Sequence, residues 1–256
     1  QIACSIGGNV AENAGGVHCL KYGLTVHNVL GVRVLTSDGD VMEIGGALYD
    51  NPGLDMLALL CGSEGMLGIV TQVTVALLPE PEKKSVILAG FKQVTDAGNA
   101  VASIIGAGII PAGMEMMDKL AVQAAEQFAH AGYPLDAAAI LIIELDGAEA
   151  ELSAVTAQVI DHLNASGAYQ IDQADDAETQ ARLWKGRKSA FPAVGRLSPD
   201  YICMDGTIPR HQLANVLTQI DELSERFGLA VANVFHAADG NLHPLILFDA
   251  NVPGQT

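Results

Sequence analysis

The chain has 256 residues, of which 50% are hydrophobic and 17% charged, so it can form one large domain or two smaller ones and is not expected to be disordered. Its formal net charge of −17 would repel phosphate backbones and anionic lipid, which argues against nucleic-acid or membrane-surface binding through general electrostatics. No apolar run approaches the roughly 18 residues of a membrane span. Small molecules or other proteins are therefore the expected partners.

The four cysteines are scattered and form no CxxC pair, so the sequence predicts neither a zinc ribbon nor a disulfide framework. A reducing cytoplasm is the expected compartment, and no signal peptide is visible. The chain begins at Gln1 without a methionine and stops shortly after a histidine-containing strand. We therefore expect a fragment that is cut at both ends.

Two glycine-rich segments occur in the first 70 residues. Gly7-Gly8 and Gly15-Gly16 flank a short polar stretch, which permits close approach of the backbone to a ligand but is also typical of ordinary tight turns. The segment 62–68 enters a β-branched run at 69–77 instead of a helix, so it is neither a Rossmann loop nor a P-loop. Such a loop can offer backbone groups to a flat cofactor, and a plain loop is the alternative.

A polar stretch around Pro79 and Pro81 divides the chain into predicted domains of residues 1–82 and 83–256. Strands and amphipathic helices alternate, so the predicted fold class is α+β, with one sheet in the second domain covered by helices on one face. The predicted strands are 29–35, 41–44, 69–77, 85–91, 137–145, 168–173 and 201–205, with a terminal hairpin of 229–235 and 245–248, and the predicted helices are 55–60, 96–107, 118–131, 149–165, 177–191 and 209–227.

The strongest local signal is Asp239-Gly240, which lies between two apolar runs and is the preferred centre of a two-residue type I′ turn. With this turn as the loop, His236 pairs directly with His243, and their Cβ atoms are roughly 4.5–5.5 Å apart. That separation lets both imidazoles bind one divalent cation at about 2.0–2.1 Å. The alternative is that one histidine fills the sheet and the other is exposed, since neither has a carboxylate neighbour in the sequence.

Four ordered segments together resemble the FAD-linked oxidases, flavoproteins of the vanillyl-alcohol-oxidase type: 6–16, 21–23, 62–71 and 236–243. Segments 201–210 and 231–251 add to the likeness. The resemblance implies the C-terminal part of a flavin-binding α+β domain, followed by an α+β cap domain with an antiparallel sheet, truncated at its C-terminus. Both glycine-rich segments would then hold FAD, through Ile6, Gly7, Gly8, Asn9, Asn13, Gly15, Gly16, Glu64, Gly65, Leu67, Gly68, Ile69 and Val70.

The resemblance also implies roles in the cap domain. His236 and His243 would bind a divalent metal (Zn, Fe or Mn) that holds the substrate's carboxylate and hydroxyl, and Arg187 would bind the carboxylate through its planar fork. A solvated charge on a helix is the alternative for Arg187. The family's pyrophosphate loop, third metal ligand and general base have no counterpart in residues 1–256, which leaves open whether these residues alone can catalyse a reaction.

The implied reaction is the oxidation of a small D-2-hydroxy acid, glycolate above all, to its 2-oxo acid, with hydride transfer to FAD. Some relatives carry a lysine near the position of Cys203. A cysteine cannot supply that fixed positive charge, so a larger dicarboxylate substrate is not expected. A D-lactate dehydrogenase of the same family and a non-catalytic flavin-binding scaffold remain as alternatives. The resemblance also implies a flavin-binding and an iron–sulfur partner subunit, through which a cytoplasmic protein could be held peripherally at the inner membrane.

Overall fold

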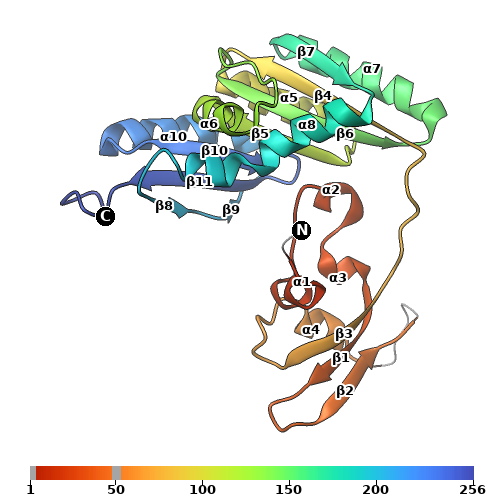
Figure 1. The fold of residues 1–256 in the computed structure, drawn as a ribbon. Helices are drawn as coiled ribbons and strands as arrows, with labels where there is room; N and C mark the ends of the chain where they lie inside the picture. The colour runs from red at the N-terminus through yellow and green to blue at the C-terminus, as the bar shows by residue number, and fades with distance from the viewer. Residues whose placement is uncertain (1–3, 48–52) are drawn as a thin grey trace. The chain divides into compact units, whose positions relative to one another are not determined.

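The computed structural model describes residues 4–47 and 53–256, and the chain divides into two compact units, Gln1–Glu80 and Pro81–Thr256. The predicted boundary after residue 82 lies two residues beyond this division. In Figure 1 the first unit runs from red to orange and the second from yellow to blue. No helix in the described ranges combines the length and the hydropathy that a membrane crossing requires.

The first unit contains a three-stranded antiparallel sheet in the order β2-β1-β3 (Figure 1). Its β1–β2 hairpin turns at residues 36–40, with Leu35 opposite Val41. A small core that includes Val10 and Leu60 packs helices against β1. The strands are β1 (Val29–Leu35), β2 (Val41–Gly45) and β3 (Ile69–Val75), and the helices are α1 (Ile6–Glu12), α2 (Cys19–Tyr22), α3 (Thr25–Asn28) and α4 (Met56–Leu60).

An eight-stranded antiparallel sheet organises the second unit, as the α+β prediction requires. Its order is β7-β4-β6-β5-β10-β11-β8, and the short β9 pairs with β11. The chain therefore places β5 and β10, which are far apart in sequence, side by side near the middle (Figure 1). The strands are β4 (Lys83–Phe91), β5 (Gly113–Asp118), β6 (Ala139–Gly147), β7 (Ala168–Ala174), β8 (Asp200–Cys203), β9 (Gly206–Thr207), β10 (Val231–His236) and β11 (Asn241–Phe248).

Helices cover both faces of this sheet, so the prediction that they cover one face is wrong. Residues 85–91 of β4 and all of β5 are buried, and successive residues of a strand point to opposite faces. One group, α5, α7 and α10, packs together, and a second group, α6, α8 and α9, does the same. The helical elements are α5 (Val94–Gly106), α6 (Lys119–Ala129), α7 (Glu149–Ala165), α8 (Ala177–Lys188), α9 (Ala190–Val194), the 3₁₀ helix η1 (Arg210–Gln212) and α10 (Leu213–Phe227).

Two further differences from the predicted elements bear on the site. The predicted helix 177–191 is two helices, α8 and α9, because Pro192 has no backbone N–H with which to continue α8. The sequence patterns also do not predict β5, whose methionines and glutamate favour helices. Pairing with β6 on one side and β10 on the other makes this segment a strand.

Candidate functional site

The histidine hairpin has a different register from the predicted one. His236 lies opposite Asn241, and His243 lies opposite Val234, so the loop is the four residues 237–240. The predicted direct pairing of His236 with His243 is therefore wrong. The loop is fixed by tertiary packing, because Ala238 is 3% exposed and its N–H donates to the carbonyl of Met114 on β5, at 3.3 Å.

The two histidines nevertheless share one face of the hairpin. The register differs from the predicted one by two residues, and a shift of two preserves the face to which each side chain points. The imidazole centroids lie 5.1 Å apart with their planes at 89°, in an edge-to-face arrangement. Both side chains are mostly buried, with 17% exposure for His236 and 15% for His243. The structure therefore brings the two predicted metal ligands together.

Glu115 joins His236 to Arg187. One carboxylate oxygen, Oε1, lies 2.8 Å from His236 Nδ1, and the other, Oε2, lies 2.5 Å from Arg187 Nη2. The second contact is an ion pair rather than a well-aligned hydrogen bond, since Oε2 meets no hydrogen-bond geometry. Glu115 is 1% exposed and Arg187 is 6% exposed, so the reading of Arg187 as a solvated charge does not hold.

The two histidines have opposite pKa shifts. Burial lowers the pKa of His236, but its hydrogen bond to Glu115 and the charge of that carboxylate raise it more, so it ends above its ordinary value. The pKa of His243 ends below its ordinary value, because burial and the charge of His236 lower it more than Asp205 raises it. His243 is thus the imidazole that loses its proton more readily.

Each of the two histidines has a carboxylate neighbour on its Nδ1 atom. His243 Nδ1 lies 3.5 Å from Asp205 Oδ1, whose side chain is 74% exposed. Among the residues that the structure describes, neither Nε2 atom has a protein partner. Asn241, directly opposite His236, also has a buried side-chain oxygen without a hydrogen-bond partner. These free acceptors suit a cation at the same face of the hairpin.

The donor set fits a divalent cation only in part. Two neutral imidazoles with free Nε2 atoms are suitable ligands for Zn²⁺, Fe²⁺ or Mn²⁺, and a carboxylate on the other ring nitrogen is the usual support of a ligating histidine. Within residues 4–47 and 53–256, however, no group of three or more His, Cys, Asp or Glu side chains could hold a metal ion. The metal site therefore remains a prediction that rests on two ligands.

The residues predicted to hold FAD lie in two segments of the first unit that contact each other. Ile6, Gly7, Gly8 and Asn9 belong to α1, Asn13 ends it, and Gly15 and Gly16 follow. Glu64, Gly65, Leu67 and Gly68 lie in the loop before β3, which begins with Ile69 and Val70. The two segments are joined by hydrogen bonds from the N–H groups of Gly62 and Glu64 to the carbonyls of Val10 and Ala11, at 2.9 and 2.8 Å. FAD binding by these residues remains a prediction.

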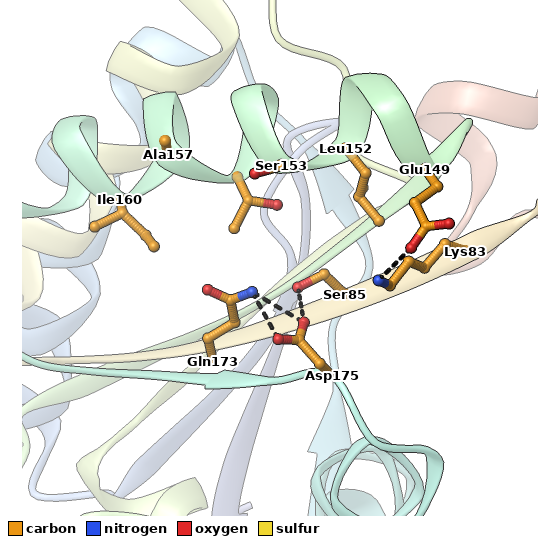
Figure 2. Close-up of a pocket in the computed structure, with 10 residues that line it drawn as sticks. Lys83, Ser85, Glu149, Leu152, Ser153, Ala157, Ile160, Gln173 and Asp175 are labelled. Carbon is orange, nitrogen blue, oxygen red and sulfur yellow. Dashed lines mark hydrogen bonds and ion pairs between the residues drawn. The ribbon is translucent and has the colours of Figure 1, made fainter.

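A pocket of about 410 Å³ elsewhere in the second unit is separate from these residues. Figure 2 shows it between α7 and the strands β4 and β7. Its polar side chains are already paired: Lys83 with Glu149 at 2.9 Å, and Asp175 with Ser85 and Gln173. No predicted site residue lines it, so we do not assign it to the functional site.

Comparison with known proteins identifies the family. Residues 80–256 match the family model described as FAD linked oxidases, C-terminal domain, and residues 1–45 match the FAD binding domain. The chain belongs to the FAD linked oxidases. The resemblance seen in the sequence motifs is therefore confirmed, and the matched domains support FAD as the cofactor.

Individual relatives agree with this assignment. The chain is 61% identical over 255 residues to glycolate oxidase subunit GlcD of Escherichia coli K12, covering 100% of the chain and 51% of that protein. It is 31% identical over 247 residues to a D-lactate dehydrogenase of Archaeoglobus fulgidus, covering 94% of the chain and 54% of that protein. A solved structure of alkyldihydroxyacetonephosphate synthase superposes with a TM-score of 0.72 at 18% identity, over 94% of the chain and 50% of that structure, and this likeness shows the fold alone. The chain thus spans about half the length of the curated relatives it matches.

Sequence reasoning missed Glu115, the residue that joins the predicted site. It lies 121 positions from His236 along the chain, in a strand that the sequence patterns did not predict. The available signal was a single carboxylate within the apolar run 113–117, since a buried charge needs a partner.

Proposed function

We propose that the full-length protein is an FAD-dependent oxidoreductase that converts a small D-2-hydroxy acid, glycolate above all, into its 2-oxo acid. The observation that carries the proposal is the cluster of Arg187, Glu115, His236 and His243 at one end of the hairpin. It places a buried guanidinium near two imidazoles with free nitrogens, a combination suited to a carboxylate next to a hydroxyl group. A scaffold that only held flavin would have no use for this arrangement.

Each residue of the cluster has a proposed role. Arg187 has five N–H donors and uses one terminal nitrogen on Glu115, which leaves donors for the substrate carboxylate. His236 and His243 would hold a divalent cation through Nε2. A bound cation would make the substrate hydroxyl more acidic, FAD would accept the hydride, and a general base that this cluster does not include would take the hydroxyl proton. The burial of this cluster excludes most water, which strengthens its interactions with a charged substrate.

The flavin would be held by the glycine-rich segments of the first unit. Large apolar side chains at predicted contact positions are exposed, with 56% for Ile6, 49% for Leu67 and 65% for Ile69. Exposed apolar side chains beside glycine-rich backbone suit a flat aromatic ring. Because the similar Escherichia coli protein is named a subunit, we also propose that the protein works with partners, a flavin-binding and an iron–sulfur subunit, in the cytoplasm or peripherally at the inner membrane.

The second candidate is D-lactate dehydrogenase activity. It is favoured by the 31% identical relative of that name. One extra methyl group in the substrate is worth only about 1–3 kcal/mol in a pocket, so the present cluster does not separate the two acids.

The test uses purified full-length protein. We expect a flavin absorbance spectrum, about one divalent metal ion per chain, and reduction of an artificial electron acceptor with glycolate faster than with D-lactate. Exhaustive chelation should abolish turnover, and restoring Mn²⁺ or Zn²⁺ should recover it. A protein that binds no flavin, or that oxidises neither acid, would contradict the proposal.

A further inference from the structure

Glu115 occupies an unusual place for a charged residue. It lies in the middle of the buried strand β5, between Met114 and Met116, and is 1% exposed. On one side it pairs in register with Ile142 of β6, and on the other with His236 of β10. A carboxylate in such a position costs several kcal/mol unless partners compensate it, so the partners are an integral part of the site.

The two partners come from different elements and have different predicted tasks. His236 ends β10 and belongs to the predicted metal pair, whereas Arg187 lies near the end of α8 and is the predicted anion-binding residue. Each contacts its own carboxylate oxygen, at 2.8 Å for His236 Nδ1 and 2.5 Å for Arg187 Nη2. One rigidly held side chain therefore fixes the position of both.

The contact to His236 has a chemical consequence. A carboxylate on Nδ1 keeps the proton on that nitrogen, so Nε2 of the neutral ring carries the free lone pair. The corresponding neighbour of His243, Asp205, is mostly exposed and 3.5 Å away, so it fixes its histidine less firmly. Glu115 is thus the stronger of the two supports.

We propose that Glu115 is a positioning residue that sets the orientation of the His236 ring and of the Arg187 guanidinium together, and so couples cation binding to recognition of the substrate carboxylate. This inference rests on the proposed function. It predicts that one substitution in β5 impairs both cation binding by His236 and carboxylate recognition by Arg187. A substitution of Arg187 alone should impair only carboxylate recognition.

The test compares Glu115→Gln with the parent in full-length, FAD-loaded protein. Glutamine keeps the size but cannot accept from both His236 and Arg187, because its amide N–H groups face one of them. We expect the Mn²⁺ dissociation constant, measured by calorimetry without substrate, to rise about 10–100-fold. With Mn²⁺ saturating, kcat should largely recover while the KM for glycolate remains raised about tenfold or more.

Glu144→Gln is the matched control. Glu144 is also a buried glutamate of the same sheet, 6% exposed, and it is paired with Lys84 at 3.6 Å instead of with the site. Its substitution should lower the melting temperature without changing the Mn²⁺ dissociation constant or the KM. If Glu115→Gln does not fold, Glu115→Asp, which keeps the charge but is one methylene too short to reach both partners, should show the same two effects.

The outcomes separate the two proposals. A parent protein that neither binds Mn²⁺ nor oxidises a 2-hydroxy acid would overturn both the proposed function and the role of Glu115. A competent parent beside a folded Glu115 variant with parental Mn²⁺ affinity and parental KM would overturn only the positioning role. A Glu115 variant that is less stable but keeps the parental Mn²⁺ affinity and KM would likewise overturn only the positioning role.

Discussion

Arg187 carries its charge into the interior of the second unit, where it is 6% exposed. A buried ion pair is often no more stable than apolar side chains of similar size, because desolvation offsets much of the attraction. Here the pairing is also incomplete, since Arg187 Nε is buried and has no hydrogen-bond partner among the described residues. A stabilising role alone does not explain an incomplete pair, whereas a binding site for an anion does. Anion binding by Arg187 remains a prediction.

Replacement of Arg187 by lysine tests that role. Lysine keeps the charge but has no planar fork, so a carboxylate would lose its two-point contact. We expect the KM for glycolate in the full-length enzyme to rise by about 10–100-fold, or about 1.4–2.7 kcal/mol, with unchanged flavin content. Arg182→Lys, on the exposed side of the same helix, is the control and should leave the KM unaltered. Equal KM values for the two variants would contradict the anion-binding role.

Replacement of His236 or His243 by alanine tests the metal site. Each substitution removes one of two proposed ligands, so most of the bound metal and nearly all turnover should be lost while FAD stays bound. His162→Ala is the control, because His162 is hydrogen-bonded to Ser103 at 2.8 Å on helices outside the cluster. Elemental analysis of the purified variants is the measurement. Equal metal content in all three would argue against the site.

At the scale of elements, the sequence predicted the face of the histidine pair but not its register. Asp-Gly is a correct turn signal, and Gly240 does have the left-handed φ of 78°. The prediction assumed that local turn chemistry sets the loop length, whereas Ala237 and Ala238 are buried and extend the loop to four residues. The period of two in a strand then preserved the shared face.

A pair of glycine substitutions measures how tightly this loop is held. An alanine Cβ at Gly240 would lie 2.3 Å from the carbonyl oxygen of Ile208, whereas at Gly228, with a φ of 64°, it would meet nothing within 4 Å. Both substitutions carry the left-handed strain of about 1–2 kcal/mol. Gly240→Ala should cost at least about 2 kcal/mol more in urea unfolding, because backbone must also move. Similar losses for both variants would show that the loop adapts freely.

The sequence pattern could not predict β5, the strand that carries Glu115. All six residues of β5 are buried, so the strand has no alternation of polar and apolar residues, and its composition favours a helix. Its neighbours β6 and β10 decide its conformation, and β10 is more than 100 residues away in sequence. The predicted partners Arg187, His236 and His243 were found through motifs, but the carboxylate that joins them depends on this long-range pairing.

Asp118, the last residue of β5, gives a prediction for pH dependence. It caps α6 by accepting from Ala121 N and is bound by Asn233, while burial raises its pKa from 3.8 to about 6. A carboxyl with a raised pKa in the folded state contributes stability that is fully present below about pH 4 and is lost as the pH rises through about 6. Asparagine does not titrate, so Asp118→Asn removes this pH-dependent loss of stability. Any cost of the substitution itself is the same at both pH values.

The measurement is urea unfolding of both proteins at pH 4 and pH 7. The stability of the variant relative to the parent should increase by about 2 kcal/mol between the two pH values. A difference that does not change with pH would show that the hydrogen bonds from Ala121 N, Asn233 N and Asn233 Nδ2 keep the pKa of Asp118 near its ordinary value.

At the scale of the whole molecule, the chain consists of two compact units. They are joined by residues 76–82, which form no helix or strand. Leu77 and Leu78 are 90% and 55% exposed and lie between the end of β3 and the start of β4. The prolines and charges of residues 79–84 predicted a boundary after residue 82, since such residues cannot support a core, and the two compact units divide between Glu80 and Pro81. The number and order of the strands in the second unit could not be predicted in the same way, because pairings such as β4 with β6 and β7 join distant segments.

Limited proteolysis with thermolysin, which cuts before exposed leucines, tests the independence of the two units. We expect early cleavage before Leu77 or Leu78 and a resistant C-terminal product that begins there, because this exposed stretch has no strand or helix to protect it. Since Arg187, Glu115, His236 and His243 all belong to the second unit, this product should keep the Mn²⁺ affinity of the uncut protein. A double substitution of Leu77 and Leu78 by glycine should delay the cut and confirm its position. Simultaneous degradation of both halves would show that the second unit depends on the first, and a resistant product without Mn²⁺ affinity would show that the histidine pair needs groups from elsewhere to hold a cation.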